Sequence, residues 1–373
     1  MATVHIEGVT KRFGGTVALD GLSLEVQDGE FFCLLGPSGA GKTTLLRCIA
    51  GLEVPDAGRI MIGGVDVTGW TPAERGVAMV FESYALYPHL SVFENLAYPL
   101  RERRTPEETI RHRVLEVAEK LRITHTLDRP PQTLSGGEMQ RVAIGRAIVR
   151  EAQVYLFDEP LSHLDAQLRE QMRSELKRLH RELGQTLIYA TPDQLEALTM
   201  PDRVAVIRSG RVVECGPPME LYYRPQHAFT AQYLGDPPMN WLPARLKDDV
   251  AQTEWFHVRL PFRAPFFGEG FLGVRPEDLC LSDGDAAPPE AIRFQALVYA
   301  VEMSGDFNIV TLRLGDRFLK AIGEVHRRYP TDRPVGVTVL PERLFLMDPV
   351  SERVWSLRKP FDPSPTHQKG DQG

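Results

Sequence analysis

The chain has 373 residues, which is too long for one average domain and suggests two domains, or three. Hydrophobic residues make up 43% and charged residues 25%, a composition that is typical of a folded globular protein and excludes a disordered one. The 43 basic and 50 acidic side chains give a formal net charge of −7, which excludes a general attraction to nucleic acid or anionic lipid. We therefore expect no nucleic acid partner, and any membrane contact to be made through protein.

The cysteines and the N-terminus indicate a compartment. Cys33, Cys48, Cys215 and Cys280 form no Cys-x-x-Cys pair, which argues against a structural zinc site or a dense disulfide framework and fits a reduced cytosol. The first residues carry no basic stretch followed by an apolar one, and no later run approaches about 18 apolar residues. We expect a protein that is neither secreted nor membrane-spanning.

The N-terminal part begins with alternating apolar residues between glycines over residues 4–26, which predicts an antiparallel sheet. The continuous apolar run at 30–35 is typical of a strand buried on both faces and ends at a glycine-rich loop. A helix is expected over 42–50.

Residues 83–150 follow a helical period and predict an inserted helical subdomain. A strand at 154–157, a helix at 168–183 and a strand at 186–189 restore the βαβ pattern of a parallel sheet. This first domain is expected to span residues 1–235.

The sequence pattern changes after residue 235. Short runs of residues typical of β-strands follow at 271–274, 294–301, 309–314 and 335–340, separated by Gly, Pro and Asp. They predict a small barrel or sandwich over residues 236–358. The polar segment 359–373 is expected to be a flexible tail.

A glycine-rich segment between the buried strand and the first helix carries the clearest chemistry. It has the P-loop pattern in the P-loop context, where backbone N–H groups wrap phosphates at a helix N-terminus. Lys42 would neutralise the outer phosphates, and the Thr43 hydroxyl would offer an oxygen to Mg²⁺. The predicted ATP-binding residues of this segment are Gly36, Pro37, Ser38, Gly39, Ala40, Gly41, Lys42, Thr43 and Thr44.

Two carboxylates follow the second buried strand, at the edge where open α/β sheets bind ligands. Asp158 is suited to hold Mg²⁺, and Glu159 is suited to polarise a water for attack on the γ-phosphate as the catalytic residue. An Asp-Glu pair by itself would more often cap a helix, but a P-loop upstream favours the catalytic interpretation.

Ser135, Gly136, Gly137 and Glu138 open an apolar-periodic helix between these two motifs. In this position they resemble the signature sequence of the ABC family, and nearly the whole chain resembles the ATPases of maltose- and glycerol-phosphate-type importers. Three further segments carry the resemblance: residues 80–92 are similar to the family's Q-loop, 161–165 to its D-loop with Asp165, and 271–279 to the opening of its C-terminal TOBE domain.

The resemblance implies an α/β P-loop NTPase of ABC type, with an antiparallel β subdomain and a helical subdomain, followed by a small all-β OB-like or TOBE domain. It implies that Phe13 stacks on adenine and that ATP and Mg²⁺ are the cofactors. It also implies a dimer in which one subunit's P-loop and the other's signature, Ser135 to Glu138 here, enclose each nucleotide. Two integral membrane permease subunits would bind near residues 84–90, and a solute-binding protein would take part indirectly. The chain would then lie at the cytoplasmic face of the cell membrane.

Two positions depart from the family pattern. Glu82 stands where the Q-loop has glutamine; it can still offer oxygen to Mg²⁺ but adds negative charge beside the phosphates. Pro192 stands where the family has a histidine that contacts the γ-phosphate, and proline has neither a side-chain donor nor a backbone N–H. We therefore expect this subunit's own site to bind ATP and hydrolyse it slowly, and to be paired with a second, competent ATPase.

Several alternatives stay open. A homodimer with two slow sites, a non-hydrolysing regulatory ATP sensor and an ABC protein that does not transport are compatible with parts of the pattern, whereas a small GTPase or kinase is disfavoured by the signature. The transported substrate is undetermined among sugars, polyols such as glycerol, and glycerol phosphate. The TOBE-like domain would bind a regulator or stiffen the dimer.

Overall fold

The computed structural model describes residues 2–282 and 288–358, so the expected flexible tail at 359–373 lies outside the described residues. The chain divides into two compact units, Met1–Glu220 and Leu221–Gly373. In the described part of the chain, no helix combines the length and the apolar character that a membrane span requires.

The first unit opens with a four-stranded antiparallel sheet in the order β2-β1-β4-β5. Its strands are β1 (Val4–Phe13), β2 (Thr16–Val26), β4 (Ala57–Ile62) and β5 (Val65–Asp66). Every second side chain of β1 near its start, such as Val4 and Ile6, is buried against the core shared with the central sheet. The predicted antiparallel subdomain is confirmed.

The central sheet has six strands in the order β10-β9-β3-β8-β7-β6. They are β3 (Phe31–Leu35), β6 (Val77–Val80), β7 (Val154–Asp158), β8 (Thr186–Thr191), β9 (Arg203–Arg208) and β10 (Arg211–Gly216). All neighbours are parallel except β10, which pairs antiparallel with β9. Strands β3, β7 and β8 are buried along their whole length, which explains their continuous apolar sequences.

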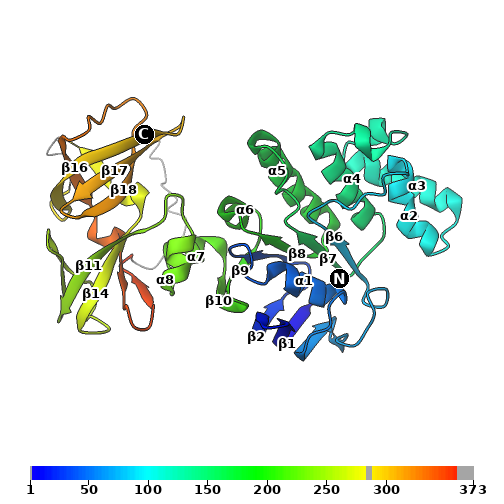
Figure 1. Ribbon diagram of the computed structural model, residues 1–373, viewed down its shortest axis with the longest axis horizontal. Coiled ribbons are helices and arrows are strands. Elements are labelled where there is room, and N and C mark those ends of the chain that lie inside the picture. Colours follow the sequence, from blue (N-terminus) through cyan, green and yellow to red (C-terminus); the bar gives the residue numbers. More distant parts are fainter. Residues whose placement is uncertain (1, 283–287, 359–373) are drawn as a thin grey trace, which may run out of the picture. The chain divides into compact units, whose positions relative to one another are not determined.

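Helices complete the first unit (Figure 1). Helix α1 (Lys42–Ala50) packs on β7 and β8, while α5 (Ala166–Leu183) buries Met172, Leu176 and Leu179. A short helix, α6 (Gln194–Thr199), follows β8. The region predicted to be a helical subdomain contains α2 (Val92–Glu102), α3 (Glu107–Lys120), the short 3₁₀ turns η1 (Thr124–Thr126) and η2 (Pro131–Thr133), and α4 (Gly136–Ile148).

The second unit is built from two antiparallel sheets. One has the order β13-β12-β11-β14-β20-β21, with strands β11 (Asn240–Lys247), β12 (Val250–Gln252), β13 (His257–Arg259), β14 (Gly268–Val274), β20 (Leu344–Met347) and β21 (Val354–Ser356). The other has the order β15-β19-β16-β17-β18, with β15 (Cys280–Ser282), β16 (Ile292–Met303), β17 (Asn308–Leu314), β18 (Arg317–Gly323) and β19 (Pro334–Val339). The 3₁₀ turns η3 (Pro276–Asp278) and η4 (Pro341–Arg343) connect strands. One core of inward-facing side chains joins both sheets, as expected for a small all-β domain.

The division between the units falls earlier than residue 235, where the sequence suggested it. Helix α7 (Pro218–Tyr223) spans the division, and α8 (Ala228–Tyr233) belongs to the second unit. Ala231 of α8 is buried in a cluster with Met239, Phe345 and Val354, all from the β-rich unit. Composition alone does not reveal this packing, because it depends on which core buries Ala231.

Candidate ATP site

The P-loop lies where the sequence predicts it, between β3 and α1. Lys42 is 3% exposed, and its ammonium donates to the carbonyl oxygens of Gly36 (2.9 Å) and Pro37 (3.2 Å). A Cβ at Gly36 would stand 2.3 Å from the carbonyl oxygen of Ile207, so glycine is required there by close backbone approach. Gly41 precedes α1 in the left-handed region, with φ of 107°. The two glycines therefore allow the tight backbone course between β3 and α1 that the P-loop pattern predicts.

The two carboxylates lie at the carboxyl end of β7, next to the P-loop. Thr43 Oγ1 donates to Asp158 Oδ1 at 2.9 Å, although 115 residues separate them in the chain. Burial raises the pKa of Asp158, and this effect is opposed by the Thr43 hydrogen bond and reinforced by the nearby charges of Glu159 and Glu82. Hydroxyl and carboxylate oxygens side by side are the ligands that Mg²⁺ takes in nucleotide sites, so Thr43 and Asp158 fit this ion.

Glu159 is held differently from its neighbour. It has a φ of 44°, which is uncommon for a residue other than glycine, and its carboxylate lies 3.3 Å from the Lys42 ammonium. Such strained backbone is found most often at functional sites. The carboxylate predicted to be catalytic is thus directed toward the residue predicted to bind phosphate.

Strand register explains why four separate segments meet. In the central sheet Leu35 of β3 is aligned with Thr191 of β8, Ala190 of β8 with Asp158 of β7, and Phe157 of β7 with Val80 of β6. Parallel strands end at the same edge. The residues that follow them, Gly36, Pro192, Glu159 and Glu82, are therefore brought to one edge of the sheet.

Glu82 has a partner that the sequence did not suggest. Its carboxylate lies 3.7 Å from His163 Nε2, in the segment similar to the D-loop, and both side chains are more than half exposed. The ring of Tyr84 also contacts His163 edge-on, with centroids 6.1 Å apart. Only the fold brings residues 82 and 163 together, so no motif could have revealed the pair.

Pro192 lies between β8 and α6, beside a network of polar side chains. The carboxylate of Glu196 accepts from Thr191 Oγ1 (2.6 Å) and Tyr189 OH (2.9 Å), and Asp193 caps α6 by accepting from the Leu195 and Glu196 amides. These contacts hold the turn, while the proline itself supplies no N–H at this edge.

Phe13 ends β1 with 46% of its surface exposed, and the Lys11 ammonium lies 5.1 Å from its ring centroid. An exposed ring of this kind is available for stacking.

Asp165, in the segment similar to the D-loop, forms the N-cap of α5 by accepting from the Leu168 amide at 2.9 Å.

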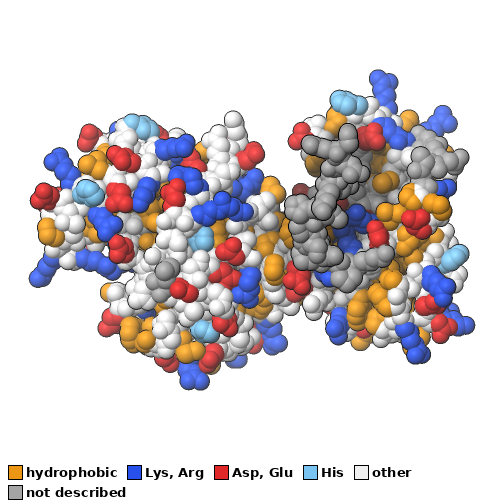
Figure 2. All heavy atoms as spheres, turned by 180° about the vertical axis from the view of Figure 1, so that it is seen from behind, with side chains coloured by type: hydrophobic (Ala, Val, Ile, Leu, Met, Phe, Trp, Pro, Cys, Tyr) orange, Lys and Arg blue, Asp and Glu red, His pale blue; other side chains and the backbone are white. Residues whose placement is uncertain are grey.

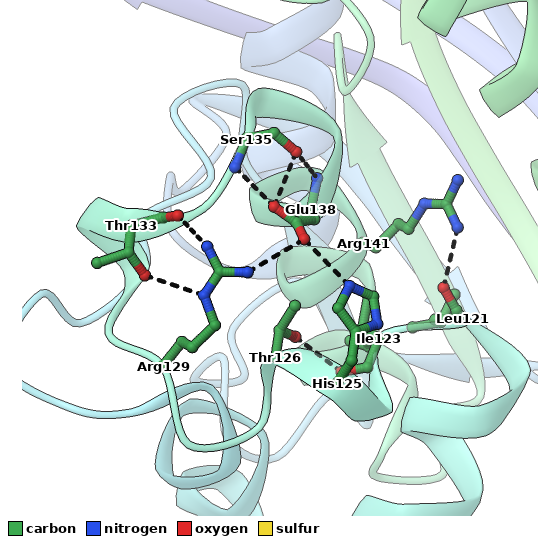
Figure 3. A network of polar contacts seen from close by, with 9 residues as sticks. All are labelled: Leu121, Ile123, His125, Thr126, Arg129, Thr133, Ser135, Glu138 and Arg141. Atoms are coloured by element: carbon green, nitrogen blue, oxygen red, sulfur yellow. Dashed lines mark hydrogen bonds and ion pairs between the residues drawn. The ribbon is translucent and has the colours of Figure 1, made fainter.

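The signature-like residues begin α4 with a capping box (Figure 3). Glu138 Oε2 accepts from the Ser135 amide (2.8 Å) and hydroxyl (2.9 Å), and the Glu138 amide donates back to Ser135 Oγ. The backbone hydrogen bond from Ser135 is the main cause that lowers the pKa of Glu138, with smaller contributions from His125 and Arg129. A Cβ at Gly137 would stand 2.7 Å from Leu168 Cδ2, so α4 begins against α5.

Among the residues that the structure describes, the Ser135 and Glu138 side chains make no polar contact with the P-loop of the same chain. In the described part of the chain, the polar contacts of the Ser135 and Glu138 side chains connect them to each other and to His125 and Arg129.

Figure 2 shows that acidic and basic side chains are interspersed over the face drawn there, so neither sign of charge dominates that surface.

Together, the P-loop on a parallel sheet, the paired carboxylates and the separate capped helix in an inserted helical region define a P-loop nucleotide-binding cassette. The sequence model of the ABC transporter family matches residues 19–162. The chain is 45% identical over 357 residues to the sn-glycerol-3-phosphate import ATP-binding protein UgpC of Rhizobium meliloti, covering 95% of this chain and all of that one. It is 49% identical to the trehalose/maltose import ATP-binding protein MalK of Thermococcus litoralis, covering 84% of this chain and 89% of that one.

Solved structures agree with these relatives. The dimeric structure of MJ0796, a bacterial ABC transporter cassette, matches with a TM-score of 0.53 and 30% identity, covering 58% of this chain and 98% of that one. The chain therefore belongs to the family of ABC transporter ATP-binding subunits that includes these sugar and sn-glycerol-3-phosphate import proteins. It is an ATP-binding subunit of the ABC type, as the sequence predicted.

Proposed function

We propose that this chain drives the import of a sugar, a polyol such as glycerol, or glycerol phosphate, from the cytoplasmic face of the cell membrane. The observation that carries the proposal is the meeting of Lys42, Thr43, Asp158 and Glu159 at one sheet edge. The named import functions of the relatives supply the substrate classes.

The roles of the residues follow from their positions. The P-loop N–H groups between Ser38 and Thr44 and the Lys42 ammonium bind the phosphates, and Phe13 stacks on adenine. Thr43 and Asp158 would hold Mg²⁺, with Glu82 as a further oxygen ligand, and the ion would supply positive charge to the phosphates. Glu159 orients and polarises the attacking water, which is the main task left to the protein in phosphoryl transfer.

Two cassettes are needed to complete a site. Gly136 and Gly137 lie apart from their own P-loop, so their N–H groups are available to a nucleotide held by a partner subunit, while the Ser135 amide is used in the capping box. Asp165 would face the same partner. The dimeric cassette structure among the matches supports an assembly of two ATPases.

The membrane subunits would bind the surface around residues 84–90. Beside it lies a hollow of about 570 Å³ lined in part by Tyr87, Tyr98 and Arg146. The two tyrosine rings are 4.8 Å apart, and the Arg146 guanidinium lies 5.1 Å from the ring of Tyr87. Aromatic and arginine side chains around a concavity are common at protein interfaces, and a helix from a membrane subunit fits there.

The chain's own site is proposed to be slow. Replacing the family's histidine with Pro192 removes a donor to the γ-phosphate, and losing one such donor costs on the order of 10²-fold in rate. Glu82 adds a negative charge close to Asp158. Since ATP binding depends on the intact P-loop, binding would survive, and we propose a heterodimer with a second, competent ATPase.

The test is ATP hydrolysis by the natural chain and by Pro192→His, each alone and in its membrane complex, with ATP binding measured in parallel. If the natural chain binds ATP but hydrolyses it very slowly, and Pro192→His hydrolyses it faster, the slow site is supported. A second ATPase should then be sought. Brisk hydrolysis by a complex containing only this ATPase would contradict the heterodimer. Failure to copurify with integral membrane subunits would favour a regulatory or non-transport role.

A further inference from the structure

A hollow of about 720 Å³ lies on the second unit, apart from any residue assigned to the ATP site. Its lining comes from β16, β17, β18, the start of β19 and the segment between β12 and β13. The residues are Trp255, Gln295, Ala296, Leu297, Arg313, Leu314, Gly315, Asp316, Phe318 and Pro334.

The floor of this hollow is a single row of side chains across four paired strands. Pro334 is aligned with Leu297, Leu297 with Arg313, and Arg313 with Phe318. Their sequence neighbours, such as Leu312 and Leu319, are buried in the core, whereas Phe318 is 55% exposed. Because side chains alternate along a strand, the row lies on the face that the core does not use.

Two aromatic side chains, Trp255 and Phe318, line the hollow. The indole of Trp255 lies against the turn between β17 and β18, where a Cβ at Gly315 would stand 3.4 Å from Trp255 Cζ2. Gly315 has a φ of 59°, so this turn favours glycine for its conformation as well as for the contact. Phe318, at the β18 end of the row, packs on Tyr299 with ring centroids 4.7 Å apart.

Polar side chains also line the hollow. Within residues 2–282 and 288–358, the side chains of Arg313, Asp316 and Gln295 form no hydrogen bond or ion pair, and neither does the indole N–H of Trp255. They offer donors from the guanidinium, the indole and the amide, and acceptors from the carboxylate and the amide. The charges of Arg313 and Asp316 are opposite, so the lining has no net charge.

We propose that this hollow binds a neutral sugar in pyranose form, of one or two rings. The faces of Trp255 and Phe318 carry partial negative charge and would pack against the C–H groups of a sugar ring. Arg313, Asp316 and Gln295 would bind adjacent hydroxyls, each of which both donates and accepts. Few polar groups between apolar walls are typical of small-molecule sites, and the lack of net charge favours a neutral ligand over a phosphorylated one.

The test uses the whole chain and three probes: maltose, trehalose and sn-glycerol 3-phosphate, followed by tryptophan fluorescence and calorimetry. Saturable binding of at least one of the two sugars, with a dissociation constant below about 1 mM, is expected. The fluorescence change should be lost in Trp255→Phe and kept in Trp70→Phe, since Trp70 belongs to the first unit.

Arg313→Ala should weaken sugar binding by about tenfold or more, because a charge-assisted hydrogen bond is lost. Arg317→Ala is the matched control: this exposed arginine follows Asp316 at the start of β18 but does not line the hollow. No saturable sugar binding, binding of the phosphate ester alone, or equal weakening by both arginine variants would overturn the proposal. The site does not depend on the proposed transport role, and sugar binding is measured without ATP, so the two can fail separately.

Discussion

The ammonium of Lys42 lies 3.3 Å from the carboxylate of Glu159, which links the phosphate-binding loop to the predicted catalytic base. Lys42 also donates to two carbonyl oxygens of its own loop, so it is held in place from both sides. Removing the charge of Glu159 therefore leaves Lys42 with its loop contacts. The chemistry and the binding at this edge can be separated by substitution.

Glu159→Gln should keep ATP binding and lower turnover by about 10²-fold or more, because the amide cannot polarise water as a base. The substitution is best made in whichever chain hydrolyses faster, the natural one or Pro192→His. Lys42→Ala in the same background should lose ATP binding as well. Unchanged turnover in Glu159→Gln, measured by phosphate release in the membrane complex, would remove Glu159 from the catalytic role.

Gly36→Ala should damage both stability and ATP binding. The added Cβ would stand 2.3 Å from the Ile207 carbonyl oxygen, and since this oxygen belongs to the backbone and the Cβ is fixed to Cα, the backbone of the loop must move. Overpacking of this kind costs about 1–3 kcal/mol. A displaced P-loop should also weaken ATP binding by about tenfold or more, since its amides must point at the phosphates.

Gly69→Ala is the control for this substitution, because a Cβ there meets nothing within 4 Å and the backbone is not left-handed. Gly69→Ala should have the same unfolding temperature and the same ATP affinity as the natural chain, as measured by thermal unfolding and ATP titration. If both variants behave like the natural chain, the close approach at Gly36 does not constrain the loop.

Local sequence signals predicted the cassette well. The helix expected over residues 42–50 is α1 with the same bounds, because the P-loop glycines mark its start and Gly51, in the left-handed region, marks its end. Buried strands were recognisable from continuous apolar runs. Pro192 and Glu82 could be noticed only because the resemblance to the family supplied expected residues at their positions.

Contacts between distant segments could not be predicted. The pairing of Glu82 with His163 depends on how β6 and the segment after β7 lie next to each other, and the hollow beside Arg313 depends on the register of four strands. The assignment of α8 to the second unit depends on which core buries Ala231. None of these leaves a local pattern in the chain.

Glu138→Gln should preserve the function of the signature segment and change how the stability of the folded chain depends on pH. Gln at this position can still complete the capping box, so Ser135 and both glycines should keep their positions and turnover should be retained. The carboxylate, however, has a pKa lowered from its ordinary value of 4.5, chiefly by the Ser135 amide. It therefore stabilises the folded state at pH values above 4.5, and this contribution is lost as the pH falls through the lower folded value.

Urea unfolding followed by circular dichroism tests this linkage. At pH 7, Glu138→Gln should be less stable than the natural chain by less than about 1 kcal/mol, because the contacts with His125 and Arg129 are partly exposed. The difference should shrink as the pH is lowered through and below 4.5, since the natural carboxylate then becomes neutral too. Glu119→Gln is the control, because Glu119 lies on the exposed side of α3 and has no side-chain partner among the described residues. Its stability should equal that of the natural chain both at pH 7 and below pH 4.5. If the difference in stability between Glu138→Gln and the natural chain is the same at pH 7 and below pH 4.5, the charge of Glu138 does not stabilise the start of α4.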